Sequence, residues 1–284
     1  MPYTEDDLLR LAEDAVKRST TVTGVQAKMS IGVEQMDATH ERFTIMGVWG
    51  SHILKPPTSL YPNLPELEDP TMHLAELAAI RTVPHALLRL QDNKLVYITR
   101  RVDRQGRPGS TRHSKLHMED MAQVTERITE HKYRGSYEQI AKALQQHAQE
   151  PILSVLEFYE QVLFAFLTGN ADMHLKNFSL LSDKEGRYRP APAYDHVPTA
   201  LVLEDSEELA LTLNGRKSRI ARTDFETAMR AAGLNERAIL NLFNRMKKAL
   251  PKWMEFIGVG FIPDEMKERY RALITERAER MGLG

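Results

Sequence analysis

The sequence predicts an α+β fold with two lobes, a smaller strand-containing lobe over residues 1–100 and a mostly helical lobe over residues 101–284. Three observations lead to this prediction. Short strand-like runs separated by turn-forming residues are concentrated in the first hundred positions. Apolar residues with helical spacing dominate the later positions. A polar loop rich in Asp and Asn directly follows a long apolar helix, as a functional loop on a helical scaffold would.

The N-terminal lobe is expected to begin with a helix. Thr4 and Asp7 have the spacing of a capping box, and the apolar residues that follow lie on one helical face until about Arg18. Pro56 and Pro57 should end a strand, because proline cannot continue the hydrogen-bonded ladder. The later elements are three strands, a Pro- and Leu-rich loop, a helix and a hairpin, at residues 25–29, 43–48, 52–54, 56–70, 73–81 and 87–99.

The C-terminal lobe is expected to be built from helices with apolar positions spaced by three and four residues. Pro151 is tolerated in the first turn of one of them, and Gly169 should end that helix. The predicted helices cover residues 118–130, 136–147, 151–168, 223–232, 236–250 and 263–281.

Composition excludes several classes of protein. A formal charge of −1 with 27% charged residues shows no global attraction to nucleic acid or membranes. The absence of cysteine excludes disulfides, thiolate zinc sites and cysteine nucleophiles. The acidic N-terminus lacks the pattern of a signal peptide, and no uninterrupted apolar stretch approaches membrane-spanning length. We therefore expect a soluble, cytoplasmic protein with no membrane partner.

The loop after Gly169 carries the strongest chemical signal. Asp172 and Asn177 have the spacing of the catalytic loop H-R-D-x-x-x-x-N, and Asp195 follows shortly downstream. Phosphoryl transfer requires a carboxylate near the attacking hydroxyl and oxygen ligands for magnesium. Asp172 suits the first role, while Asn177 and Asp195 suit the second.

The residues between Asn177 and Asp195 predict that these two side chains meet. An apolar run at 178–181, a turn near 183–186 and a returning segment read as a β-hairpin. Asn177 would then lie across from about position 192, close to Asp195. The alternative is a polar loop followed by a surface hairpin, since Asp and Asn are common loop residues.

Eight stretches taken in order resemble the HipA family of serine/threonine kinases, which are toxins of bacterial toxin–antitoxin systems. The resemblance implies a two-lobed protein-kinase-like, HipA-like fold with ATP and Mg²⁺ as cofactors. The matching stretches are TVTGVQAKMS (21–30), HILKPP (52–57), RRVDR (100–104), KLHMEDMAQ (115–123), KYRGSYEQIAKAL (132–144), GNADMHLKNFSLL (169–181), PAYDHVPT (192–199) and LALTLNGRK (209–217).

The resemblance also implies partners. Fuller members of the family carry an additional N-terminal subdomain, whereas this chain resembles the short HipT-type kinases, in which a small HipS-like protein supplies that part. A helix-turn-helix antitoxin would be a second partner and would connect the protein to DNA only indirectly. Family members phosphorylate aminoacyl-tRNA synthetases and so arrest translation, which makes a synthetase the expected substrate.

In the C-terminal lobe, the resemblance assigns roles to Asp172, Asn177 and Asp195, and the position of His174 and Lys176 in the same loop suggests roles for these two. Asp172 matches the catalytic aspartate, and Lys176 is expected to steady the transferring phosphate. His174 is assigned to the ATP-binding part of the loop, which it would hold by packing and hydrogen bonding. Asn177 and Asp195 match the magnesium ligands.

In the N-terminal lobe, Lys55 matches the lysine that contacts the ATP phosphates, and Glu76 on the following helix is its expected carboxylate partner. Backbone groups near 97–100, including those of Thr99 and Arg100, are expected to bind adenine. Gly24 and Lys28 belong to the matched phosphate-binding loop, because glycine permits close backbone approach and lysine adds positive charge. Thr21 and Thr23 stand where the family has serines that are autophosphorylated, so we hypothesise regulatory self-modification at one of them, with neighbouring Ser19 and Thr20 as alternatives.

Two other functions remain open at this point. The first is a catalytically silent nucleotide-binding partner protein of a toxin–antitoxin complex, for which the threonines of the phosphate-binding loop and the missing subdomain leave room. The second is a metal-dependent phosphoesterase built on Asp172, His174 and Asn177. A phosphoesterase would need further His and Asp ligands, and the sequence shows no spacing signal for them.

Overall fold

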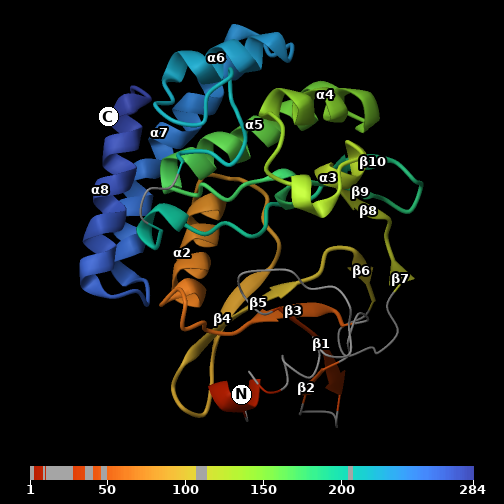
Figure 1. The fold of residues 1–284 in the computed structure, drawn as a ribbon, viewed down its shortest axis with the longest axis vertical. Coiled ribbons are helices and arrows are strands. Elements are labelled where there is room, and N and C mark those ends of the chain that lie inside the picture. Colours follow the sequence, from red (N-terminus) through yellow and green to blue (C-terminus); the bar gives the residue numbers. More distant parts are fainter. Residues whose placement is uncertain are drawn as a thin grey trace. The chain divides into compact units, whose positions relative to one another are not determined.

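The computed structural model describes residues 3–8, 10, 28–35, 41–45, 50–106, 114–203 and 207–284. The chain divides into two compact units (Figure 1): a strand unit, Met1–Asp69 with Val83–Leu116, and a helical unit, Pro70–Thr82 with His117–Gly284. This division differs from the predicted boundary after residue 100. Backbone bonds explain the difference, because the N–H of Ala193 donates to Arg81 and the N–H of Leu116 donates to Asp103.

The strand unit contains a five-stranded antiparallel sheet in the order β2-β1-β3-β5-β4. One face of this sheet buries a cluster of seven apolar residues: Leu8, Met29, Ile31, Leu54, Leu90, Val96 and Ile98. Five of them lie in strands, where Met29 and Ile31, and likewise Val96 and Ile98, take alternating positions, as the two-residue period of a strand requires. The strands are β1 (Met29–Gln35), β2 (Glu41–Ile45), β3 (His52–Lys55), β4 (His85–Arg89) and β5 (Leu95–Arg100), and a short pair β6 (Arg104–Gln105) and β7 (Ser114–Lys115) follows.

The predictions for this part of the chain are partly confirmed. Thr4 and Asp7 form the expected capping box, in which the Thr4 N–H donates to Asp7 at 2.9 Å and the Asp7 N–H donates to Thr4 at 3.2 Å. The hairpin of β4 and β5 is also confirmed, with Asn93 in its turn at φ 67°. The first strand begins at Met29 instead of ending there, so its predicted position was wrong.

Helix α2 (Leu64–Leu77) begins inside the region that was predicted to be a loop. Pro70 lies within it and removes one backbone hydrogen-bond donor from the helix. Leu64, Leu67 and Leu74 are buried, and burial of such side chains outweighs one lost hydrogen bond. Tertiary packing therefore overrides the local signal of the prolines.

The helical unit consists of six further α-helices, three short 3-10 helices and a three-stranded sheet in the order β10-β9-β8 within its described residues. Helices α7 and α8 lie beside α5 (Figure 1). The elements are β8 (Met118–Asp120), α3 (Met121–Val124), η2 (Thr129–His131), α4 (Tyr137–His147), α5 (Pro151–Thr168), η3 (Leu175–Asn177), β9 (Ser179–Ser182), β10 (Tyr188–Pro190), η4 (Thr199–Leu201), α6 (Arg222–Ala231), α7 (Glu236–Val259) and α8 (Asp264–Arg280).

Five of the six helices that were predicted in this half are present, although α7 continues past Pro251 to Val259. The predicted helix over residues 118–130 was wrong. Met118 and Asp120 instead pair with Leu181 and Ser179 across β8 and β9, and Asp120 then caps the single-turn helix α3. Pairing with a distant strand thus overrides an apolar spacing that suits a helix.

Helix α5 forms the centre of the helical unit. All its residues from Phe158 to Thr168 are buried, and Tyr159 and Phe164 are fully inaccessible. Trp253 of α7 packs edge-on against Phe164 and donates its indole N–H to the carbonyl of Leu74 at 2.8 Å. Among the described residues, α5 is the one helix long and apolar enough to span a membrane, but 72% of it is buried inside the protein, as in a core helix.

Glu160 is a buried carboxyl group on α5, only 4% exposed, and Arg245 lies 2.5 Å from it. Burial raises the pKa of Glu160 to about 7, although Arg245 opposes this shift. The folded state therefore holds a proton that the unfolded state releases above pH 4.5, so stability should fall as the pH rises from 4.5 through 7. We expect a loss of about 3 kcal/mol over this range, abolished by Glu160→Gln. Denaturant titrations at several pH values test this expectation.

The matched control for Glu160 is Glu157→Gln on the same helix. The Glu157 side chain is 36% exposed and lies 3.6 Å from Arg81. The charge of Glu157 is the smallest of the causes that act on the pKa of Glu160, so this control should retain most of the pH dependence of the original protein. An unchanged pH dependence in Glu160→Gln would contradict the assignment to Glu160.

Candidate active site

The polar loop begins where α5 ends at Gly169. This residue has a φ of 77°, in the left-handed region that favours glycine. A Cβ atom here would lie 2.5 Å from Leu273 and 3.2 Å from Ala200. Glycine thus allows the chain to leave the helix abruptly and place Asp172 three residues later.

Hydrogen bonds inside the loop bring Asp172 and Asn177 together. The carbonyl of Asp172 accepts from the His174 N–H and from the Asn177 side-chain amide, each at 2.8 Å. Asn177 is only 6% exposed, so its side chain is held in place. Because the amide nitrogen is occupied, the amide oxygen is the atom that Asn177 offers to a cation.

The predicted hairpin is present. Leu180 pairs with Pro190 and Ser182 with Tyr188, and the Ala191 N–H donates to Ser179 at 2.8 Å. Continued for two more residues, this register places Asn177 across from position 193, one residue from the prediction. Asp195 follows two positions later.

Asp195 and its neighbour are tied to the Asp172 loop through fully buried groups. Asn170 accepts a hydrogen bond from the Asp172 N–H at 3.1 Å, and its amide nitrogen lies 3.4 Å from Nδ1 of His196. Asp195 itself has a φ of 63°, a conformation that Asp tolerates better than most residues. The backbone of Asp172 is therefore connected through Asn170 to His196, the residue that follows Asp195.

His174 is buried behind these groups. Its Nδ1 atom has no hydrogen-bond partner among the described residues, and its ring meets Tyr133 edge-on at 5.0 Å. Burial lowers the pKa of His174, although the carboxylates of Asp172 and Asp195 oppose the shift. His174 is accordingly a neutral group with one unsatisfied nitrogen, consistent with the packing role expected for it.

These residues suit a magnesium ion. Mg²⁺ prefers carboxylate and amide oxygens, which are the atoms that Asp195 and Asn177 supply. A transition metal would favour several imidazole ligands, and the imidazoles next to these oxygens are His174 in the loop and His196 beside Asp195. The oxygen donors of Asn177 and Asp195 thus agree with magnesium.

Lys176 has a different neighbour from the one expected. Its ammonium group forms an ion pair with Asp120 at 2.8 Å, and Asp120 also caps α3. Contact between Lys176 and a phosphate would require this ion pair to break. The structure therefore assigns Lys176 an anchoring contact with α3, and its phosphate-steadying role stays a prediction.

In the strand unit, Lys55 is the last residue of β3 and only 3% exposed. Its ammonium lies 2.5 Å from Glu68 and 5.4 Å from the centre of the Tyr97 ring. The prediction that Glu76 is the carboxylate partner of Lys55 was wrong. Glu76 stands eight residues after Glu68 on α2, about 12 Å further along the helix, and it bonds to Thr82 and His73.

The residues expected to bind adenine lie in a central strand. β5 pairs with β3 on one side and β4 on the other, and the Arg100 N–H donates to Pro84 at 2.9 Å. The hydroxyl of Thr99 donates to the same carbonyl at 3.2 Å. The N–H of Arg100 and the hydroxyl of Thr99 are thus committed to Pro84, and the adenine-binding role of the Thr99 and Arg100 backbone stays a prediction.

Several predicted residues belong to the phosphate-binding loop. Thr21, Thr23 and Gly24 lie outside the described residues, so their assignments stay predictions. Lys28 is described and exposed, immediately before β1.

Sequence reasoning missed four residues that contact predicted site residues: Glu68 in the strand unit, and Tyr133, Asn170 and Asp120 in the helical unit. The phenol of Tyr133 donates to Oδ1 of Asp172 at 2.5 Å. One local signal was available, because Asp120 and Gln123 have the spacing of a capping box. The contacts of Tyr133 and Glu68 join residues far apart in the sequence, and the role of Asn170 depends on its buried partner His196. The sequence therefore carries no local signal for these three residues.

Sequence comparison identifies relatives. A family model described as the HipA-like C-terminal domain matches residues 20–254. Y4dM of Sinorhizobium fredii (strain NBRC 101917 / NGR234), a candidate kinase by its name, is 28% identical over 84% of this chain and 60% of its own length. The serine/threonine-protein kinase toxin HipA of Shewanella oneidensis is 22% identical over 93% of this chain and 64% of its own. The chain thus spans about 60% of the length of these relatives.

Two solved structures share the fold. HipA of Shewanella oneidensis MR-1, in complex with HipB and operator DNA, superposes with a TM-score of 0.76 at 20% identity, over 99% of this chain and 72% of that chain. The Helicobacter pylori proinflammatory kinase CtkA superposes with a TM-score of 0.59 at 18% identity, over 81% of this chain and 86% of that chain. The predicted α+β, protein-kinase-like fold is confirmed by these similarities.

Proposed function

Because the chain belongs to the family of HipA-like C-terminal domains, we propose that it is an ATP- and Mg²⁺-dependent serine/threonine protein kinase. One observation supports this proposal most directly. Asp172 and Asn177 are joined at 2.8 Å within one loop, and Asn170 and His196 connect this loop to Asp195. A carboxylate, an amide and a second carboxylate are the groups that phosphoryl transfer requires, and these bonds fix the residues that carry them.

The site residues of the helical unit have separate roles in this proposal. Asp172 would accept the proton of the acceptor hydroxyl as it attacks the terminal phosphorus of ATP. Asn177 and Asp195 would hold Mg²⁺ through their oxygens. The bound cation would neutralise charge on the phosphates. Asn170 and His174 would keep the loop in shape, so that little reorganisation accompanies the reaction.

In the strand unit, Lys55 would contact the ATP phosphates. Its ammonium is held by Glu68, so the charge is positioned in advance and its conformational freedom is already reduced. The phosphate-binding loop with Gly24 and Lys28 would add backbone donors and a second positive charge. Phosphorylation of Thr21 or Thr23 would place a dianion in this loop and repel ATP.

We further propose that the protein is the toxin component of a toxin–antitoxin system in the cytoplasm. The similar HipA structure contains HipB and operator DNA, which supports a helix-turn-helix antitoxin as a partner here. A small HipS-like protein would supply the N-terminal part of the longer relatives. The proposed substrate is an aminoacyl-tRNA synthetase.

Labelling with γ-³²P-ATP tests the kinase proposal. The purified protein is incubated with a bacterial lysate and magnesium, and transfer of label to a protein band is expected. Removal of the metal with EDTA should abolish transfer, and added magnesium should restore it. ATP binding without transfer to any protein would instead favour the catalytically silent nucleotide-binding partner.

A further inference from the structure

The hydroxyl of Tyr133 lies where the phosphate-accepting hydroxyl of a substrate should bind, next to the Asp172 carboxylate. It donates to Oδ1 of Asp172 at 2.5 Å, which is the hydrogen bond that an acceptor hydroxyl makes to a catalytic carboxylate. Tyr133 is 43% exposed, so this contact with Asp172 lies at the surface of the protein. A hydroxyl of the protein itself therefore fills the position that a substrate serine or threonine would need.

Contacts with the loop hold the Tyr133 ring in this position. The ring meets His174 edge-on at 5.0 Å, and the Lys132 ammonium lies 4.9 Å from its centre. The Leu175 N–H donates to the Lys132 carbonyl at 3.2 Å, which ties the two segments together. Burial of the phenol oxygen and the bond to Asp172 raise the pKa of Tyr133 well above its usual range, so the hydroxyl keeps its proton at neutral pH.

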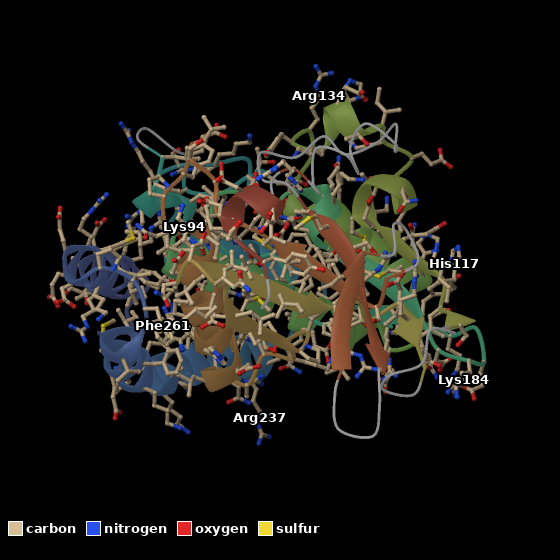
Figure 2. The ribbon with its side chains drawn as sticks, turned by 90° about the horizontal axis from the view of Figure 1, so that it is seen from below. Lys94, His117, Arg134, Lys184, Arg237 and Phe261 are labelled. Atoms are coloured by element: carbon tan, nitrogen blue, oxygen red, sulfur yellow. The ribbon has the colours of Figure 1, made fainter. Side chains whose placement is uncertain are left out.

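Comparison with Tyr137, four residues later, distinguishes a releasable contact from a structural one. Tyr137 is fully buried, and its hydroxyl donates to the Met173 carbonyl at 3.0 Å. Tyr133 is exposed, and the following residue, Arg134, projects away from the ribbon (Figure 2). Displacing Tyr133 would thus open no cavity in the core, whereas displacing Tyr137 would.

We propose that Tyr133 is a specificity-determining residue of the acceptor site, whose hydroxyl holds Asp172 until a protein substrate displaces it. This inference rests on the proposed function, in which Asp172 receives the acceptor's proton. A docked protein segment has additional contacts whose binding energy favours displacement of the phenol. Water makes no such contacts, so Tyr133 suppresses wasteful transfer of phosphate to water.

Hydrolysis of magnesium-ATP, with water as the acceptor, tests this proposal without a known protein substrate. Tyr133→Phe keeps the ring and removes the hydroxyl. We expect its hydrolysis turnover to rise about tenfold, the usual scale of one hydrogen bond to a charged group, with the KM for ATP unchanged. Tyr133→Leu, which also removes the contact with His174, should raise turnover in the same direction. The double variant Tyr133→Phe/Asp172→Asn should lose the gain.

Tyr188→Phe is the matched control. The hydroxyl of Tyr188 lies 2.8 Å from His117 on the three-stranded sheet, so this variant should hydrolyse ATP like the original protein. Unchanged or lower turnover in both Tyr133 variants would overturn the proposal and indicate that Tyr133 merely orients Asp172. If the original protein neither hydrolyses ATP nor labels any protein, the kinase proposal fails, and this inference fails with it.

Discussion

Replacing Asp172 by asparagine is expected to lower phosphoryl transfer by about 10²–10⁴-fold, the range found for a general base. Asparagine keeps the shape of the side chain and can still accept the Tyr133 hydrogen bond, but it cannot take a proton. The backbone carbonyl that binds His174 and Asn177 is not altered by the substitution. Steady-state labelling with γ-³²P-ATP should therefore show a loss of kcat, with the KM for ATP little changed.

The control for this loss is Asp264→Asn in the first turn of α8, whose carboxyl group is 97% exposed. This variant should transfer phosphate at the original rate. Thermal unfolding of Asp172→Asn should occur near the temperature of the original protein, because the substitution leaves no buried charge. Full activity in Asp172→Asn would contradict the assignment of Asp172 as the catalytic carboxylate.

Replacing Lys55 by methionine is expected to destabilise the protein by about 3–5 kcal/mol, because it removes the ammonium group that lies 2.5 Å from the buried Glu68 carboxylate. The two side chains are only 4% and 2% exposed, so water cannot replace the lost partner. The double variant Lys55→Met/Glu68→Leu removes both charges and should recover most of this stability. It should not recover ATP binding, because the phosphate-contacting ammonium is still missing.

The variant Glu76→Gln tests whether Glu68, the observed partner of Lys55, or Glu76, the predicted partner, contributes to stability. Glu76 lies on the same helix but at the surface, where its carboxylate is 45% exposed, so this variant should unfold like the original protein. Denaturant titration and binding of a fluorescent ATP analogue measure the two effects independently. A Lys55→Met protein as stable as the original would show that Glu68 does not depend on Lys55.

Local features of the chain were predicted well where neighbouring residues decide the structure. The capping box of Thr4 and Asp7, the termination of α5 at Gly169, and the hairpin between Ser179 and Pro190 all depend on residues a few positions apart. The hairpin register also predicted that Asn177 and Asp195 belong to one site. Both the α+β fold and the family resemblance were accessible from such motifs, and both are confirmed.

Contacts between distant residues were not predicted. The pairing of Met118 with Leu181 replaced a helix by a strand, and Lys55 bonded to Glu68 although Glu76 had seemed the natural partner. Neither the strand pairing nor the ion pair has a local signal in the sequence, because each depends on how the surrounding elements pack.

The sequence by itself determined which groups are available for chemistry: an aspartate and an asparagine at a five-residue interval, a second aspartate beyond a hairpin, and a strand lysine. Only the tertiary structure decided how these groups are held. Asn170 joins His196, Lys176 joins Asp120, and Tyr133 joins Asp172 across 26, 56 and 39 residues of chain. The physical reason is that a hydrogen bond in a buried site goes to whichever partner packing brings within about 3 Å, and spacing along the chain does not specify that partner.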